Sequence, residues 1–367
     1  MPVNLKTIFK LLLSLGITVV FLWAAFRSVD LTLLWDTMRQ ADPFWLVACA
    51  FLFILAVPPR AWRWKILLRP VASDITLWRT SVATLIAYAG NNVFPRAGEI
   101  ARVMEVKRGR DNSLSAILAT VLVERVIDLI ALLTLFGAIL FTLREEIGRV
   151  FPWMEGVAIA AFAGSLLLLV LFGLLSTYGD RALTLVQNSV GRLSQKLAER
   201  LVEILKALFK GLSSVKGTSG YAGILLSSIL LNCIYILATY VIFLSFSFSS
   251  YELGILDAVV IMVVSTVGVI IPTPGGTGTY HYFCSQALYR IYDVPLAEAL
   301  AFATVVHGIV FITYLIAGGP ACSGCTSKTN SAKQTRTLPA IEEKWPSPLR
   351  LPQSTPFAAA GERDWYG

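Results

Sequence analysis

The chain has 367 residues, of which 56% are hydrophobic and only 15% are charged, and its formal net charge is +8. Soluble globular domains have about 45–50% apolar and about 25% charged residues, so this composition excludes a soluble multidomain enzyme. The positive charge does not indicate a nucleic-acid partner, because in so apolar a chain it first marks the loops that face the cytoplasm. The composition predicts an integral membrane protein.

Six apolar runs approach or reach the 17–25 residues or so that cross a bilayer. They cover residues 8–26, 43–57, 114–143, 157–176, 220–246 and 296–318. The first has no clear small-residue cleavage site after it, so we expect a retained helix and not a secretory signal. Two further runs, 75–95 and 253–292, are interrupted by glycine and proline.

Lysine and arginine are distributed unevenly between the loops. Residues 58–112, 178–216 and 321–367 carry net charges of +6, +4 and +2, whereas 27–42, 144–155, 247–257 and 290–298 carry −1, −1, −2 and −1. Because basic loops stay in the cytoplasm, both ends of 75–95 are predicted inside and both ends of 253–292 outside. Each interrupted run is therefore predicted to form a re-entrant hairpin, and both chain termini are predicted to be cytoplasmic.

The order of elements predicts an all-α polytopic bundle with about six full transmembrane helices and two re-entrant helical hairpins. The membrane domain, residues 1–319, divides into halves of about 8–143 and 157–319 that repeat the same unit with inverted orientation. Broken helices at matching positions of inverted halves are typical of transporter binding sites. A plain bundle of eight or nine helices, two of them broken, is the alternative.

Three segments have other expected roles. Residues 180–212 have leucines at helical spacing opposite lysine and arginine, which predicts a cytoplasmic amphipathic helix on the headgroups or on the bundle. Residues 321–367 are rich in Ser, Thr and Pro, which predicts a disordered cytoplasmic tail. Cys49, Cys233 and Cys284 lie in apolar runs and are expected to be small core residues.

Three charged residues, Glu124, Arg125 and Asp128, interrupt the apolar run 114–143. Charges at this depth cost about 2.5–3.5 kcal/mol each, so they must pair or face water. Glu124 and Asp128 are i,i+4 and share a helical face, while Arg125 is i,i+3 to Asp128 and is able to bridge to it. The functional interpretation is a polar wall of a headgroup pathway, and the structural one is an ion pair that joins helices.

A second polar cluster surrounds the break at the end of run 75–95. Arg96 and Arg102 present planar forks that suit phosphate, and Glu99 could pair with either arginine or with a cationic headgroup. The alternative is a basic cytoplasmic loop whose arginines only follow the positive-inside rule.

The break in run 253–292 is rich in glycine. Gly275, Gly276 and Gly278 permit tight turns, and the free N–H groups that open the next half-helix form a potential anion site. His281 follows one turn later and His307 lies in the last apolar run, where a proton or ligand role competes with a structural hydrogen bond. Two histidines without a third ligand argue against a metal site.

The basic residues that interleave with Trp62 and Trp64 directly after the run 43–57 are Arg60, Arg63, Lys65 and Arg69. Tryptophan and arginine at this level are typical of an interfacial anchor, with direct capture of lipid phosphate as the alternative.

These motifs resemble a known family. The chain contains Phe94-Pro95-x-x-Gly98-Glu99-x-x-Arg102, Glu124-Arg125-x-x-Asp128 and Pro272-x-Pro274-Gly275-Gly276-x-Gly278 in that order. They resemble those of the lysylphosphatidylglycerol synthase transmembrane family, or flippase-like membrane proteins, which includes the membrane half of the multiple peptide resistance factor. The resemblance covers roughly residues 8–318. It implies a multi-pass protein of the bacterial inner membrane that moves or modifies lipids, with the three motifs lining the lipid pathway.

The chain departs from that family in two respects. An acidic residue often stands where this chain has His281, and the soluble aminoacyl-transferase domain of the full synthase is not seen in this sequence. We therefore expect a protein that binds and translocates a phospholipid or an isoprenoid-phosphate carrier, with membrane lipids as partners, no cofactor and no catalytic residue. Arg96, Arg102 and Arg125 would hold phosphate, and Glu99, Glu124 and Asp128 would balance charge. The alternative is a membrane-embedded lipid-modifying transferase, or the membrane partner of a separate lipid-modifying enzyme.

Overall fold

The computed structural model describes residues 5–94, 97–110, 112–142, 218–246 and 248–334, together with scattered residues between 156 and 202. The chain divides into two units, Met1–Cys325 and Thr326–Gly367. The secondary structure of the described ranges consists of helices, without a strand. This confirms the predicted all-α class.

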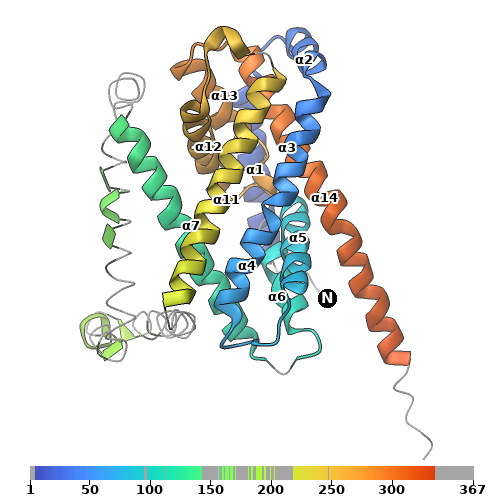
Figure 1. Ribbon diagram of the computed structural model, residues 1–367, viewed down its shortest axis with the longest axis vertical. Coiled ribbons are helices and arrows are strands. Elements are labelled where there is room, and N and C mark those ends of the chain that lie inside the picture. The colour runs from blue at the N-terminus through green and yellow to red at the C-terminus, as the bar shows by residue number, and fades with distance from the viewer. Residues whose placement is uncertain are drawn as a thin grey trace, which may run out of the picture. The chain divides into compact units, whose positions relative to one another are not determined.

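The helices follow one another along the chain in the order seen in Figure 1. They are α1 (Leu5–Phe26), α2 (Leu31–Gln40), α3 (Pro43–Leu55), α4 (Val57–Leu68), α5 (Leu77–Val93), α6 (Ala97–Lys107), α7 (Leu114–Thr142), α11 (Thr218–Ser245), α12 (Ile255–Ile270), α13 (Thr279–Ile291) and α14 (Leu296–Gln334). Two short 3-10 turns, η2 (Phe248–Tyr251) and η3 (Pro274–Gly276), lie on either side of α12.

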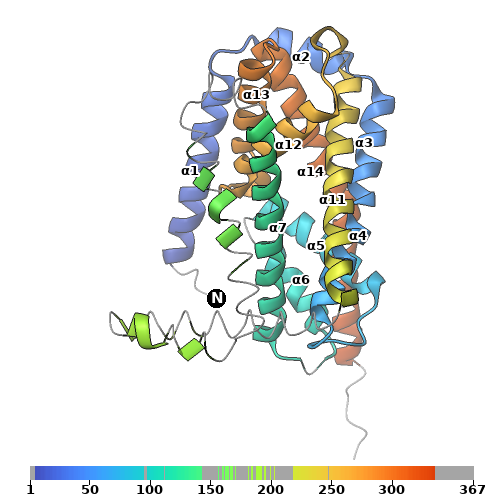
Figure 2. The same cartoon turned by 60° about the vertical axis from the view of Figure 1, so that its left-hand side comes forward.

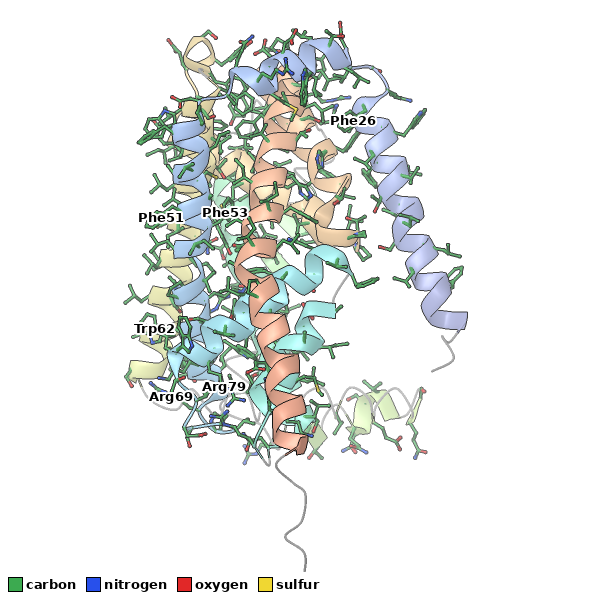
Figure 3. The ribbon with its side chains drawn as sticks, turned by 90° about the vertical axis from the view of Figure 1, so that its right-hand side faces the viewer. Phe26, Phe51, Phe53, Trp62, Arg69 and Arg79 are labelled. Atoms are coloured by element: carbon green, nitrogen blue, oxygen red, sulfur yellow. The ribbon has the colours of Figure 1, made fainter. Side chains whose placement is uncertain are left out.

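Three stretches of the described residues are long and apolar enough to cross a membrane: Pro43–Leu68, Ser219–Ser245 and Leu296–Pro320. A fourth is added if Leu11–Phe26 and Leu31–Gln40, which meet at 89°, count as one bent span. Helix α7 has 29 residues and is also long enough, but it carries the charged residues of the run 114–143. Figure 3 shows Phe51 pointing outward from α3, and such exposed apolar side chains suit a helix surrounded by lipid.

The predicted end of the second run, at residue 57, is wrong. Helices α3 and α4 together form one candidate span of 26 residues that continues to Leu68. Pro58 and Pro59 do not end it, because they occupy the first turn of α4, where a missing N–H leaves no hydrogen bond unmade. The continuation carries Arg60 and Arg63 into the bundle.

The run 253–292 forms the helical hairpin α12–α13, as predicted. The run 75–95 does not form a hairpin by itself: it is one continuous helix, α5, and the second arm of its hairpin is α6, beyond the run. Figure 1 shows α12 and α13 in the upper part of the bundle and α5 and α6 in the lower part. Helix α5 has 17 residues and is therefore about 25 Å long, which is shorter than the hydrocarbon core of about 30 Å. The arms of each hairpin approach closely: a Cβ on Gly98 would lie 1.8 Å from the Ala87 carbonyl oxygen, and one on Gly268 would lie 2.7 Å from that of Thr279.

The tips of the two hairpins meet. Gly275, with φ of 59°, lies against Asn92 at the end of α5, since a Cβ on this glycine would be 3.3 Å from Asn92 Oδ1. The Asn92 amide also donates to the Phe311 carbonyl of α14, at 3.1 Å. Helix α1 closes over the same tip, where Ser14 Oγ donates to the Pro272 carbonyl at 2.7 Å. Residues far apart in the sequence are thus brought to one point.

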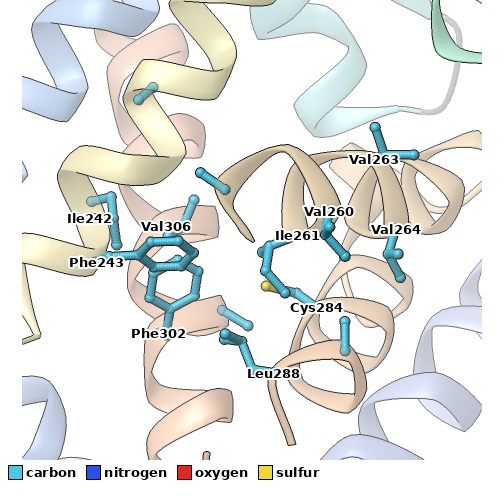
Figure 4. Packing of buried hydrophobic residues seen from close by; sticks show 14 of the residues in the cluster. Ile242, Phe243, Val260, Ile261, Val263, Val264, Cys284, Leu288, Phe302 and Val306 are labelled. Carbon is cyan, nitrogen blue, oxygen red and sulfur yellow. The ribbon is translucent and has the colours of Figure 1, made fainter. Parts of the chain in front are cut away.

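An apolar core surrounds the hairpin α12–α13 and joins it to α3, α11 and α14. Figure 4 shows its aromatic part, with Phe243 of α11 beside Phe302 of α14, and its aliphatic part around Ile261 and Leu288. Cys49 and Cys284 are buried as expected, whereas Cys233 is exposed, so the expected core position of Cys233 is wrong. This cysteine lies on a face of α11 that also exposes Ile229 and Leu237.

Helix α14 continues beyond the expected end of the last run, as far as Gln334. The predicted disordered tail, residues 321–367, stays a prediction. The rest of the tail, most of the run 157–176 and most of the amphipathic segment 180–212 lie outside the described residues.

Candidate functional site

Seven charged side chains of α4, α6 and α7 form a connected network of ion pairs. We refer to them as the ion-pair cluster: Arg60, Arg63, Glu99, Arg102, Glu124, Arg125 and Asp128. Figure 2 shows α6 and α4 beside the lower half of α7, and α7 contacts both. Five members of the cluster were candidate residues chosen from the sequence: Glu99, Arg102, Glu124, Arg125 and Asp128. Arg102 pairs with Glu124 and not with Glu99, the partner that the sequence suggested.

Glu124 is the centre of the cluster, and its side chain is fully buried. Its Oε2 lies 2.8 Å from Nη1 of Arg102, and its Oε1 lies 3.0 Å from Nε of Arg60 and 3.7 Å from Nη2 of Arg63. One carboxylate of α7 therefore holds arginines from both α4 and α6. This is the structural interpretation of the charges in run 114–143, an ion pair that joins helices.

Asp128 binds the same two arginines of α4. Its Oδ2 lies 2.8 Å from Nη2 of Arg60, and its Oδ1 accepts a short hydrogen bond from Nη2 of Arg63. The spacing of Glu124 and Asp128 by four residues places both on one face of α7, as the sequence predicted. Arg63 donates its remaining Nη1 to Ser228 Oγ of α11, at 3.0 Å, and so connects a fourth helix.

The cluster has one accessible edge. Arg125 Nη2 lies 2.5 Å from Glu99 Oε1, and these side chains are 43% and 26% exposed. The predicted bridge between Arg125 and Asp128 is present only at 3.7 Å, so Glu99 is the closer partner. The reason is geometric. Helix α6 packs beside α7 and presents Glu99 directly to Arg125, whereas the Arg125 side chain must fold back along α7 to reach Asp128.

The interpretation of Arg60 and Arg63 as interfacial anchors is wrong, because both are buried against α7. Sequence reasoning assigned both to the membrane interface because the apolar run 43–57 ends before them, and it gave capture of lipid phosphate only as the alternative. Their i,i+3 spacing places both arginines on one face of α4, and this was the available signal. Trp64 next to them is also buried, and its ring lies 4.6 Å from the Arg102 guanidinium carbon.

Tyrosines connect the cluster to the hairpin tips. The Arg60 guanidinium lies 5.6 Å from the ring of Tyr88 on α5, which stacks on Tyr314 of α14 at 4.1 Å. The Tyr88 and Tyr235 hydroxyls are 3.1 Å apart. Tyr88 is one turn before Asn92, the residue that contacts the second hairpin.

The glycine-rich break and the two histidines also come together. Gly276 and Gly278 adopt φ of 80° and 85°, which confirms that the break requires glycine. The rings of His281 and His307 are 4.7 Å apart, and His307 Nε2 lies 3.3 Å from Thr277 Oγ1. The N–H of Gly278 lies 3.4 Å from His281 Nδ1, and those of Gly276 and Thr277 bond to carbonyls within the break. An anion bound there would have to replace these bonds.

Arg96 lies outside the described residues. Within the part of the chain that the structure describes, no group of three or more His, Cys, Asp or Glu side chains is arranged to hold a metal ion.

The fold and the cluster define the class of protein: a multi-pass helical membrane protein with buried charges between its helices. Its sequence matches the family described as "Lysylphosphatidylglycerol synthase TM region" over residues 11–318. The chain therefore belongs to that family, as the resemblance of its motifs indicated. No solved structure matches the chain.

Three curated relatives are similar at low identity. Glycosyltransferase AglD of Haloferax volcanii is 26% identical over 315 residues, which are 77% of this chain but 49% of that relative, so the chain spans about half of its length. A UPF0104 membrane protein of Methanothermobacter thermautotrophicus is 25% identical, with 78% of this chain and 86% of the relative covered. A third, of Pyrococcus horikoshii, is 25% identical, with 84% and 95% covered.

Proposed function

We propose that this protein binds the charged headgroup of a membrane lipid at the ion-pair cluster and moves the lipid across the bilayer. The observation that carries the proposal is the position of the cluster: seven charged side chains, most of them buried, within an apolar bundle and with one accessible edge. A headgroup that leaves the interface needs such a polar environment, because a charge in the hydrocarbon core is costly.

The energetics of the cluster favour a function beyond helix packing. Removing two ions from water costs several kcal/mol per ion, and apolar residues of similar volume often stabilise a core equally well or better. A bundle that needed only stability would gain little from four arginines. Ionisable residues inside a membrane are therefore functional candidates.

The two hairpins support translocation in particular. They enter from opposite ends of the bundle and meet at Asn92 and Gly275, the arrangement that an inverted repeat around a central site would produce. The proposal includes the charge-based orientation, with both termini in the cytoplasm of a bacterial cell and the membrane domain in its inner membrane.

Lipid modification is the second candidate function. It is favoured by the similarity to Glycosyltransferase AglD, which covers 49% of that relative. In this alternative, the chain would present a lipid carrier to a separate enzyme or act on the lipid itself. It predicts that purified protein with phosphatidylglycerol and lysyl-tRNA forms lysyl-lipid, whereas the main proposal predicts no product.

The direct test is lipid translocation in proteoliposomes. A fluorescent phospholipid in the inner leaflet is protected from a membrane-impermeant quencher, so translocation is measured as the loss of protection. We expect Arg125→Gln to lower the rate at least tenfold while the protein still inserts and purifies intact. Arg27→Gln, a matched change at an arginine outside the cluster, should leave the rate unchanged. Equal rates for the two variants would contradict the proposal.

A further inference from the structure

Helix α2 lies across the end of the bundle, between two helices that enter the membrane. It follows α1 at an angle of 89° and ends directly before Pro43, where the span Pro43–Leu68 begins. Figure 1 shows α2 at the upper end of the bundle, next to the start of α3. A helix perpendicular to a crossing helix runs along the membrane plane, so α2 lies at the level where α1 and α3 leave the hydrocarbon.

Helix α2 is tied to the bundle at both ends. The Asp30 carboxylate accepts from the N–H groups of Thr32 and Leu33, at 2.8 and 3.3 Å, and so caps the first turn. After the last turn, the N–H of Asp42 donates to the Ser245 carbonyl of α11 at 2.9 Å, and the Ser245 hydroxyl donates to the Asp42 carbonyl at 3.2 Å. The direction in which each face of α2 points is therefore set by the fold.

The apolar face of α2 is wider than the surface on which it packs. Leu34 is buried with Leu300 and Ala301 at the start of α14, and Met38 packs against the same group. With 3.6 residues per turn, Leu31 and Trp35 belong to the same apolar sector as Leu34 and Met38. Leu31 and Trp35 are nevertheless 62% and 52% exposed, so half of this sector extends beyond the bundle.

Arginine covers the exposed tryptophans at this end of the bundle. The Arg39 guanidinium carbon lies 4.9 Å from the centroid of the Trp35 ring, and that of Arg27 lies 4.8 Å from the ring of Trp23, at the end of α1. An arginine folded over a tryptophan combines an apolar body with a charge that reaches water, which suits the boundary between lipid and water.

We propose that α2 is an in-plane membrane anchor, whose Leu31 and Trp35 side chains are buried at the boundary between the headgroups and acyl chains of the adjoining leaflet. The apolar face of such a helix lies about 5–10 Å into this boundary. The packed side of α2, with Leu34 and Met38, then holds the start of α14 at the level of the interface. This role is separate from the proposed translocation, since the ion-pair cluster lies on α4, α6 and α7.

The charge and the size of the exposed sector favour lipid as its partner. Asp36 and Arg39 cancel within α2, so the contact is apolar and requires no anionic headgroup. Leu31 and Trp35 together expose on the order of 200 Å², whereas a stable dimer buries about 800 Å² per partner. A second copy of the chain would thus gain little from this sector.

The first test measures the depth of α2 in phosphatidylcholine proteoliposomes by spin labelling. The native cysteines are replaced by alanine, and one new cysteine at a time, at position 31, 33, 35 or 36, carries a nitroxide. We expect labels at 31 and 35 to collide more often with oxygen, which is concentrated in the bilayer, than with a water-soluble nickel chelate, and labels at 33 and 36 to show the reverse. Access of the chelate to all four labels would overturn the anchor. Protection of 31 and 35 from both reagents would assign the sector to another protein chain and overturn it as well.

The second test keeps the native cysteines and makes the same substitution at two leucines of α2. Leu31→Gln places an amide in the apolar boundary, whereas Leu33→Gln, at a leucine that is 49% exposed on the polar side, places it in water. In proteoliposomes, the melting temperature should fall by about 2–4 °C in Leu31→Gln and remain unchanged in Leu33→Gln. Equal shifts in the two variants would overturn the orientation of α2.

The third test separates apolar from electrostatic contact. The collision ratios of labels at positions 31 and 35 should be the same in phosphatidylcholine and in vesicles that also contain phosphatidylglycerol, and the same at low and high salt, because α2 carries no net charge. Labels that enter the bilayer only when phosphatidylglycerol is present would overturn the apolar basis of the anchor.

Discussion

The hairpins α5–α6 and α12–α13 have the same plan but are held in the bundle by different forces. Each is broken near its tip, and each has a glycine where its two arms cross, Gly98 in one and Gly268 in the other. Hairpin α5–α6 is tied to its neighbours by ion pairs from Glu99 and Arg102 to α7. Hairpin α12–α13 is embedded in the apolar core, with Cys284 and Leu288 fully buried.

This difference indicates where binding takes place. Apolar packing is fixed by shape and is lost when a polar ligand enters, whereas an ion pair can exchange one partner for a ligand of like charge. The pair of Glu99 and Arg125 is suited to such exchange, since both side chains are partly exposed at the surface of the bundle. The second hairpin in turn provides a rigid surface for the tip of the first.

The largest effect is expected from Glu124→Gln. The neutral amide leaves three buried arginines without their shared carboxylate, and breaking a buried pair in this way costs about 3–5 kcal/mol. The melting temperature in detergent should fall far more than in Glu99→Gln, which removes a half-exposed carboxylate. Equal losses in the two variants would show that the buried centre is not the main electrostatic support of the first hairpin.

Gly98→Ala should have the next largest effect, because its Cβ would lie 1.8 Å from the Ala87 carbonyl oxygen. Overpacking costs about 1–3 kcal/mol, and here the backbone itself must move. The control is Gly308→Ala on α14, where nothing lies within 4 Å and alanine should stabilise the helix slightly. If thermal unfolding shows the same stability for both variants, the arms of α5 and α6 do not cross as described.

The histidines of the second hairpin should tolerate neutral changes better. His281→Gln and His307→Gln each weaken one buried polar contact, so the loss of stability should be about 1 kcal/mol. Lipid translocation should keep its wild-type pH profile in both variants if these rings serve packing. A flattened pH profile would instead support the proton role that the sequence suggested.

The smallest effect concerns the loops outside the bundle. Arg110 Nη2 lies 2.9 Å from Asp74 Oδ2, and this hydrogen bond lowers the pKa of the Asp74 carboxyl below its usual value. A lowered pKa in the folded state means that the contribution is present at neutral pH and is lost as the pH falls through that pKa. Asp74→Asn should therefore melt slightly below the wild type at pH 7 and level with it in acid. A gap that widens in acid would contradict this sign.

Much of the fold was predictable from the sequence, because hydrophobic run length and loop charge are strong signals in membrane proteins. They identified α1, α7, α11 and α14 and the hairpin α12–α13, but only one arm, α5, of the other hairpin. The site was predictable only in part: the i,i+4 spacing on α7 gave the shared face of Glu124 and Asp128, but their partners come from α4 and α6. Which helices are neighbours depends on packing, and the end of the apolar run at residue 57 led to Arg60 and Arg63 being assigned to the membrane interface.

The most direct test of the headgroup site is a charge swap at its accessible edge, Glu99→Arg combined with Arg125→Glu. The swapped pair can still form the ion pair between α6 and α7, so the melting temperature should recover relative to either single variant. It reverses the charges that a headgroup would meet, so lipid translocation in proteoliposomes should remain at least tenfold below that of the wild type. Recovery of wild-type translocation in the swapped protein would show that the pair only joins helices.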